Sequence, residues 1–424
     1  MTEAGAGFAG LWEALLPVGR TPAGYRRYSW TPADLACRAW FAEAAGARNL
    51  PVETDRNGNL WAWWRGRDSG APAVAVGSHL DSVPDGGAFD GPLGVASAFA
   101  AIDLLRERGF APARPVAVAA FTEEEGARFG VACLGSRLLA GAIEPAAAAG
   151  LRDGDGVSLA EAMAGAGLDP AALGPDEDRL AGLAAYVELH IEQGSALDGL
   201  GAPLGLAEGI WPHGRWRLEF AGRADHAGTT RIADRHDPML PFAATVLAAR
   251  AAAAGRGALA TFGKVIAEPG AANGISSAVR AWLDARAPDE ATLDGLVTEV
   301  SAAARTAAAE HGVALELRRE SFTPAVSFDP ALRDRLAAVL APEAGGPAAS
   351  GPDPGRSEAG GGIPVLPTGA GHDAGILAAR LPTAMLFVRN PTGVSHSPAE
   401  HADRADCLAG VTALAAVLAD LAGP

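Results

Sequence analysis

The stretch at residues 77–94 carries the first side chains that could do chemistry. His79, Asp81 and Asp90 stand there among closely spaced glycines. A histidine and a carboxylate eleven residues apart, His79 and Asp90, are two of the ligand types that divalent metal ions bind. The glycines allow a second interpretation, in which they serve only to let a long loop turn tightly. The stretch alone leaves both interpretations open, and we interpret it as half of a metal site.

Further candidate ligands occur at three other places. An acidic run, Glu123 to Glu125, follows an apolar segment, and histidines stand at His190 and His396. With the first stretch, they offer three imidazoles and at least two carboxylates. Such a set suits two borderline divalent ions, with Asp90 as a bridge between them. Zinc is the first choice of metal, with manganese or cobalt next.

The acidic run also supplies what metal-assisted hydrolysis requires, one carboxylate that holds the metal and a neighbouring one that takes a proton from the attacking water. Three glutamates in a row are more often a solvated helix face. Here they directly follow an apolar strand and precede Gly126, which favours the functional interpretation. Asp81, two residues after His79, could accept the ring N–H and orient that ligand. Four single histidines are interpreted as surface or core residues: His213, His236, His311 and His401.

The elements that must position these residues form a predicted βαβ unit. Apolar segments predict strands at residues 73–78 and 115–121, and an alanine-rich segment at 94–108 predicts the helix between them. The two strands are therefore expected to be parallel. A third strand begins near Tyr186 and leads to His190. Because ligand sites of open α/β sheets lie at the carboxyl ends of the strands, we expect the candidate ligands to converge there.

A separate domain is expected at residues 209–323. Its pattern runs strand, helix, strand, strand, helix, strand, which is typical of a ferredoxin-like sandwich. The flanking segments, 1–208 and 324–424, form the catalytic, metal-binding domain into which the sandwich is inserted. Residues 199–208, punctuated by glycine and proline, are interpreted as a linker.

The bulk properties of the 424-residue chain narrow the function classes. A formal net charge of -16 argues against binding to nucleic acid or to an anionic membrane, because both require a basic face, and favours a small substrate. No uncharged apolar run approaches the roughly 18 residues of a membrane-spanning helix. Residues 1–10 lack the features of a signal peptide, and the three cysteines show no paired spacing. We therefore expect a cytoplasmic protein.

Six motifs together resemble a known family: GSHLDSVPDGGAFDGPLGV, FTEEEGARF, ELHIEQG, GRADHAGTT, GAGHDA and GVSHSPAE. They occur in this order between residues 77 and 400, so the resemblance covers most of the chain. The chain is similar to the dinuclear metal amidohydrolases that include N-carbamoyl-L-amino-acid hydrolases, allantoate amidohydrolases and β-ureidopropionases. They are a branch of the zinc aminopeptidase and carboxypeptidase G superfamily. ELHIEQG and HAGTT are typical of the ureido-cleaving branch rather than of ordinary peptidases.

The resemblance implies a fold and a metal site. The fold is α/β, a zinc-aminopeptidase-like catalytic domain with a mainly parallel sheet flanked by helices, plus an inserted ferredoxin-like α+β domain that acts as lid and dimerisation domain. The implied ligands are His79, Asp90 and His190 for one ion and Asp90, Glu125 and His396 for the other. Glu124 would be the general base. The two ions would be zinc, with manganese, cobalt or nickel as alternatives.

The resemblance also implies how a substrate is held. Gln193 would face the ureido group, and the inserted domain would contribute His226, Asn273 and Arg286. Arg286 suits a substrate carboxylate, because a guanidinium group offers two parallel donors. His226 would also help to stabilise the tetrahedral oxyanion. In the family, the counterparts of His226 and Asn273 commonly reach the active site of the other subunit, which implies a homodimer.

Three positions depart from the family pattern and leave the identity of the substrate open. Arg231 follows HAGTT where proline is common, Gly274 stands where a proline is often found, and Gly375 replaces a residue that is frequently larger and polar. In relatives, the peptide bond after the bridging aspartate is often cis. The resemblance therefore predicts strain at the bond between Asp90 and Gly91.

The sequence and the resemblance predict hydrolysis of the C–N bond of a linear ureido acid, R–NH–CO–NH2, with release of ammonia. The expected substrates are allantoate or an N-carbamoyl-L-amino acid, and N-carbamoyl-β-alanine is a further candidate. A metallopeptidase or aminoacylase of the same superfamily is the alternative enzyme. A metal-loaded binding protein is the alternative outside catalysis, but it should lack a ligand or the base, and this sequence lacks neither.

Overall fold

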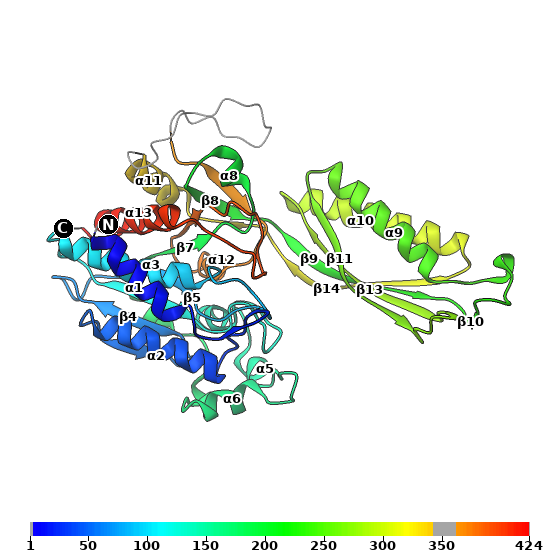
Figure 1. Ribbon diagram of the computed structural model, residues 1–424, viewed down its shortest axis with the longest axis horizontal. Helices are drawn as coiled ribbons and strands as arrows, with labels where there is room; N and C mark the ends of the chain where they lie inside the picture. The colour runs from blue at the N-terminus through cyan, green and yellow to red at the C-terminus, as the bar shows by residue number, and fades with distance from the viewer. Residues whose placement is uncertain (1–2, 342–361, 424) are drawn as a thin grey trace. The chain divides into compact units, whose positions relative to one another are not determined.

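The structure is a computed structural model that describes residues 3–341 and 362–423 (Figure 1). The chain divides into two compact units. The larger unit combines Met1–Glu208 with Ser327–Pro424, and the inserted unit is Gly209–Val326, compared with the expected boundaries at 209 and 323. The sequence also predicts an exposed Gly/Pro-rich loop at residues 342–364, of which 342–361 lie outside the described residues.

The larger unit is built on a nine-stranded sheet in the order β15-β8-β17-β7-β5-β6-β4-β3, with β16 beside β8. The four central strands are parallel: β17 (Thr383–Val388), β7 (Leu183–Ile191), β5 (Ala73–His79) and β6 (Val116–Phe121). On the two sides, β8 (Leu204–Ile210) and β4 (Leu60–Trp64) pair antiparallel with them, and the sheet is completed by β3 (Val52–Thr54), β15 (Val326–Ser327) and β16 (Val365–Thr368). The sheet is therefore mixed around the expected parallel centre.

Successive side chains of β7 point to opposite faces of the sheet. Val187, Leu189 and Ile191 belong to the main hydrophobic core, so the side chains between them, Glu188 and His190, point to the opposite face. All five are buried. β6 is a continuous apolar run, buried throughout, as is typical of parallel strands that are covered on both faces.

Helices cover the sheet of the larger unit. α3 (Pro92–Glu107) packs on β5 and β7, and α1 (Glu3–Leu15) and α13 (Arg404–Ala422) pack on α3 (Figure 1). α2 (Pro32–Gly46) contacts β3 and β4, and α11 (Pro330–Leu340) contacts α13 and β17. α12 (Asp373–Leu377) lies against β7, β17 and α4 (Leu134–Ala140). The region after α4 contains the short helices that the sequence predicts: α5 (Pro145–Ala149), α6 (Leu159–Gly165) and α7 (Glu177–Ala181).

One helix in the described part of the chain, α13, is long and apolar enough to cross a membrane by length and composition. Within its most apolar window, 56% is buried inside the protein. Val411, Leu414 and Leu418 join the same core as α3. These contacts are those of a core helix.

The prediction that residues 199–208 form a linker is wrong. Leu204–Ile210 forms β8, which pairs with β17 through Leu204 to Leu206, and both leucines belong to the main core. Gly201, with a left-handed φ of 63°, ends the short helix α8 (Ala196–Leu200). The glycine and proline therefore mark a helix end and a turn rather than an unpaired segment.

The inserted unit has the predicted ferredoxin-like fold. In chain order it contains β9 (His213–Ala221), α9 (Met239–Ala254), β11 (Leu259–Glu268), β13 (Ala278–Arg286), α10 (Glu290–Glu310) and β14 (Ala314–Thr323). The strands form an antiparallel sheet in the order β11-β13-β9-β14, and Trp216, Leu218 and Phe220 alternate into its core. A two-stranded ribbon of β10 (Asp225–His226) and β12 (Gly274–Ile275) follows the end at which Ala221 pairs with Ala278.

Candidate metal centre

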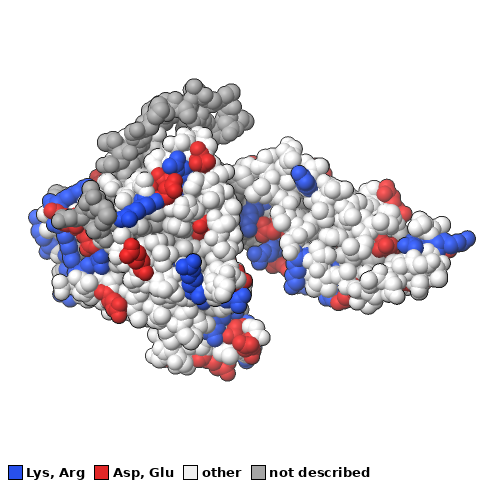
Figure 2. Space-filling model, viewed as in Figure 1, with Lys and Arg blue, Asp and Glu red and all other residues white. Residues whose placement is uncertain are grey.

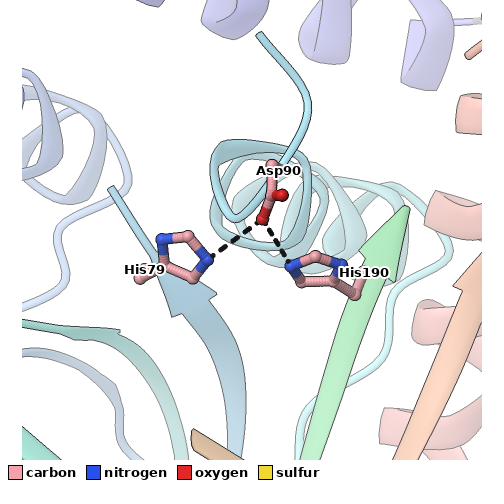
Figure 3. Close-up of side chains that lie close together, drawn as sticks. All are labelled: His79, Asp90 and His190. Carbon is pink, nitrogen blue, oxygen red and sulfur yellow. Dashed lines mark ion pairs between the residues drawn. The ribbon is translucent and has the colours of Figure 1, made fainter. Parts of the chain in front are cut away.

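The first ligand group forms where two neighbouring strands end. His79 is the last residue of β5, His190 lies near the end of β7, and Asp90 comes from the loop between β5 and α3 (Figure 3). The Asp90 Oδ1 atom is 3.1 Å from His190 Nε2 and 3.5 Å from His79 Nε2. All three side chains are buried. The two histidines are more than a hundred residues apart in the sequence, and the pairing of β5 with β7 brings them close together.

The second ligand group forms on the other oxygen of the same carboxylate. Asp90 Oδ2 is 3.5 Å from His396 Nε2, and the same nitrogen is 3.5 Å from Glu125 Oε2. The side chain of His396 is half exposed, whereas Asp90 and Glu125 are nearly covered. The two oxygens of Asp90 therefore face two separate ligand groups, which is the arrangement expected of a bridging carboxylate.

Unpaired buried atoms test whether these residues fit metal ions. The Nε2 atoms of His79 and His190 and the Oε1 atom of Glu125 are buried and have no hydrogen-bond partner. The opposite ring nitrogens are engaged, because His79 Nδ1 lies 3.1 Å from the main-chain oxygen of Asp81 and His190 Nδ1 lies 2.8 Å from that of Ile191. These contacts turn both Nε2 atoms into the site. Buried polar atoms normally have partners, so divalent cations fit this set.

The electrostatics of Asp90 favour its ionised form. Burial raises the pKa of this carboxyl, but the positive charges of His190 and His79 outweigh burial and hold the pKa well below its usual range. A carboxylate that stays ionised can share its two oxygens between two cations.

The expected role of Asp81 requires a correction. Its carboxylate lies 3.6 Å from His79 Nδ1, beyond a good hydrogen bond, and the ring instead contacts the Asp81 main-chain oxygen. The carboxylate accepts hydrogen bonds from the backbone N–H groups of Glu124 and Glu125, at 3.1 Å each. Asp81 therefore holds the acidic loop in place, and only its backbone orients the histidine.

Glu124 lies beside the first ligand group and is buried. Its Oε2 atom is 3.8 Å from His79 Nε2. Burial raises the pKa of Glu124 well above its usual value, and the charge of His79 opposes this shift. A buried carboxyl group beside the ligands is suited to take up a proton and return it. Because Glu123 and Glu124 are buried where β6 ends, a solvated helix face is excluded for Glu124.

Glu123 is the structural member of the acidic run. Its Oε1 atom accepts hydrogen bonds from the N–H groups of Phe129 and Arg128, at 2.7 and 2.8 Å, and its backbone adopts a left-handed φ of 56°. These bonds close the loop that follows β6. Because of the left-handed turn at Glu123, the side chains of Glu123 and Glu124 point in different directions.

Glu123 should give the metal-free protein a pH-dependent stability. Burial and the charge of Asp81 raise the pKa of its carboxyl from 4.5 to about 7. Between these values the folded state keeps a proton that the unfolded state has lost. The stability is therefore full below about pH 4.5 and falls by at most about 3 kcal/mol as the pH rises to about 7.

Denaturant unfolding in EDTA at about pH 5 and pH 8 measures this effect. The free energy of unfolding should fall more steeply for the wild type than for Glu123→Gln, because glutamine keeps the acceptor oxygen and loses no proton. Equal slopes in the two proteins would contradict the assignment.

Gln193 also lies at the second ligand group. Its Nε2 atom donates to Asp90 Oδ2 at 2.8 Å and is 3.4 Å from His396 Nε2. The amide therefore stands beside Asp90 and His396.

The other three expected substrate residues lie in the inserted unit, but at two different ends of it. His226 and Asn273 come together at the ribbon, where the N–H of Ala227 donates to the oxygen of Asn273 at 3.1 Å. Arg286 pairs in register with His213 at the opposite end of β9. Its Nε atom donates to Asp284 Oδ1 at 2.8 Å. Nine residues of β9 separate the two ends by roughly 25 Å at about 3.3 Å per residue.

Sequence reasoning missed Glu400. Its Oε2 atom accepts hydrogen bonds from the N–H groups of Phe89 and Asp90, at 2.9 and 3.0 Å, so it fixes the loop that carries the bridging carboxylate. Gly87 is required at this contact, because a Cβ atom there would lie 2.3 Å from the Glu400 carboxylate. The signal was present, since Glu400 ends the GVSHSPAE motif.

His372, in the GAGHDA motif, was also missed. The centroids of the His372 and His190 rings are 4.6 Å apart, and the two rings lie close to the carboxylate of Glu188. Burial and the charge of His190 hold the pKa of His372 well below its usual value. A neutral ring is therefore packed behind the first ligand group.

The bond between Asp90 and Gly91, where the resemblance predicts strain, is not cis; the cis bond found among the described residues is Glu268–Pro269. The turn is made instead by a φ of 83° at Gly91. A Cβ atom at this position would lie 2.4 Å from the ring of His79. Glycine is needed because the backbone approaches a ligand closely and adopts a left-handed conformation.

Arg231, Arg389 and Asn390 each make local contacts. Arg231 pairs with Asp234 on the surface of the inserted unit. Near the second ligand group, Arg389 pairs with Asp406, and the buried Asn390 donates to the oxygen of Val394 at 2.8 Å. Arg389 and Asn390 therefore support the loop that leads to His396.

Comparison with known proteins identifies the chain. The sequence pattern of peptidase family M20/M25/M40 matches residues 75–420. The chain belongs to this family. It is 38% identical over 412 residues to an N-carbamoyl-L-amino acid amidohydrolase of Geobacillus stearothermophilus, covering 95% of this chain and 96% of the relative. An allantoate amidohydrolase of Escherichia coli is 32% identical, with 96% of each chain covered.

The fold agrees with the same relationship. The crystal structure of an amidase of the hydantoinase/carbamoylase family from Burkholderia multivorans matches with a TM-score of 0.84, at 30% identity and 98% coverage of both chains. The resemblance inferred from the motifs is confirmed, and the protein is a hydrolase of this family.

Proposed function

We propose that the protein hydrolyses the C–N bond of a linear ureido acid and releases ammonia, with an N-carbamoyl-L-amino acid or allantoate as substrate. The observation that carries the proposal is the bridging geometry of Asp90. Its two oxygens face two groups of ligands, and Glu124 lies beside one of them. Relatives named for the hydrolysis of carbamoyl amino acids and allantoate support the substrate class.

The residues divide the work between binding and proton transfer. His79, Asp90 and His190 would hold one divalent ion, and Asp90, Glu125 and His396 the other. Zinc fits these ligands, and manganese, cobalt or nickel are alternatives. When bound, the ions supply Lewis acidity that activates water and stabilises negative charge.

Glu124 moves the proton. It takes a proton from the water that attacks the ureido carbon and gives it to the nitrogen that leaves as ammonia. Gln193 orients the ureido group beside Asp90. Arg286 binds the substrate carboxylate with two parallel donors, and His226 stabilises the oxyanion.

Ammonia release from a panel of substrates tests the proposal. We expect turnover of allantoate, N-carbamoyl-L-amino acids or N-carbamoyl-β-alanine, loss of turnover on chelation, and its return with zinc or manganese. Cleavage of dipeptides without any turnover of ureido compounds would replace the proposal by a peptidase, the activity in the family's general description. No hydrolysis of either class by the metal-loaded protein would reject both.

We further propose that the active enzyme is a homodimer. A ureido acid is much shorter than the roughly 25 Å between the two ends of β9, so one inserted unit cannot bring Arg286 and His226 to the same substrate. A dimer can bring these two residues, one from each subunit, to the same substrate. Arg286 of one subunit binds the substrate that meets His226 and Asn273 of the partner subunit.

The inserted unit offers an apolar surface that fits a second copy. On α9, Met239, Leu240 and Leu247 are 41%, 49% and 71% exposed, and the face of the inserted unit that is in view around α9 is mostly free of charged side chains (Figure 2). The neighbouring β11 is an edge strand of its sheet, with Leu259 55% exposed. An exposed apolar helix beside an open sheet edge is typical of a surface that is covered in an assembly.

A further inference from the structure

Cys133 contacts the proposed general base directly. Its Sγ atom donates to Glu124 Oε1 at 3.2 Å, and both side chains are buried. The cysteine belongs to the turn that precedes α4, and its N–H also donates to the main-chain oxygen of Glu124, at 2.6 Å. Two hydrogen bonds therefore join this residue to the base, one from the backbone and one from the side chain.

The contact distinguishes the two oxygens of Glu124. Oε1 accepts from the thiol, whereas Oε2 lies 3.8 Å from His79 Nε2, on the side of the metal ligands. A free carboxylate could rotate and exchange its oxygens. The thiol restrains this rotation and keeps Oε2 directed at the ligands.

The backbone of Cys133 is shaped for this contact. Its φ and ψ of 56° and 36° are left-handed, which is uncommon for a residue with a side chain. The turn is braced by Ser136, whose Oγ atom lies 3.1 Å from the main-chain oxygen of Cys133 and 2.5 Å from Oδ1 of the buried Asp373. Through Ser136, Asp373 of α12 thus stabilises the strained backbone of Cys133 next to Glu124.

We propose that Cys133 is a positioning residue for Glu124, with its thiol holding Oε1 so that Oε2 receives the proton of the attacking water. The proposal rests on the proposed function, because it takes Glu124 as the base. The thiol acts through Glu124 and does not react. Burial raises its pKa well above the usual value, so it stays protonated and keeps its donor.

Kinetics of two variants test the role. Cys133→Ala removes the donor and should lower kcat about five- to tenfold with KM and metal content unchanged, because the base is still present but no longer held. Cys133→Ser has the same left-handed requirement and keeps a donor, so it should restore kcat to within about threefold of the wild type. Cys37→Ala and Cys407→Ala, at two other buried cysteines, should leave kcat unchanged.

Infrared spectroscopy tests the hydrogen bond without using turnover. The S–H stretching band that disappears in Cys133→Ala should move to higher frequency in Glu124→Ala, because the thiol loses its acceptor. A band that does not move, or serine and alanine variants with the same kcat, would overturn the proposal. A wild type that is inactive on every ureido compound while the band still moves would refute the proposed function and leave the thiol contact established.

Discussion

Replacing Glu124 by glutamine should lower kcat by about three orders of magnitude, within the range expected for loss of a general acid–base. Glutamine has nearly the same shape, but its amide cannot accept a proton from water. Its burial and the 3.8 Å between its Oε2 atom and His79 Nε2 make the carboxyl of Glu124 the group best placed for this transfer. Metal content should match that of the wild type, because His79, His190 and His396 are untouched. Steady-state kinetics and metal analysis of the same preparation measure both quantities.

Glu123→Gln is the matched control for this variant. It makes the same chemical change one residue earlier, where the carboxylate accepts two backbone hydrogen bonds. An amide oxygen can accept the same bonds, so kcat should stay within about threefold of the wild type. If Glu124→Gln retained most of its activity, or if both variants lost activity equally, Glu124 would not be the base.

Much of the fold could be predicted from sequence because its elements are marked locally. The alternation of Trp216, Leu218 and Phe220 in β9 and the apolar run of β6 each specify a strand without reference to distant residues. β8 could not be recognised in this way. Its leucines are separated by glycine and alanine, and only pairing with β17 gives them a core to join.

The same distinction applies to the candidate metal centre. The types of its ligands and their position after strands predicted the centre, because histidines and carboxylates that gather at the carboxyl ends of strands are typical of metal sites. The contacts of Asp81, Glu400 and Cys133 could not be predicted, because each depends on a backbone that another segment supplies. Asp81 binds the N–H groups of residues more than forty positions away. Glu400 binds N–H groups about three hundred positions away.

Two inactive variants should restore activity to each other if the site is shared between subunits. Glu124→Gln and His226→Ala should each have little activity when produced alone. In a randomly mixed population, half of the dimers carry one chain of each kind. Each mixed dimer has one site with Glu124 and with His226 of the partner subunit, so the mixture should regain about a quarter of the wild-type activity.

The recovery distinguishes the shared site from the alternative. If Glu124 and His226 acted together within one chain, every site in the mixed dimer would lack one of them, and no activity would return. Leu247→Asp in both chains should abolish the recovery and give a monomer in sedimentation, because it places a charge on the exposed apolar side of α9. Leu35→Asp, at a leucine of α2 that is 46% exposed, is the matched control and should change neither result. Because Arg286 and His226 lie at opposite ends of the inserted unit's sheet, recovery would also explain why the proposed binding residues for so small a substrate are so far apart.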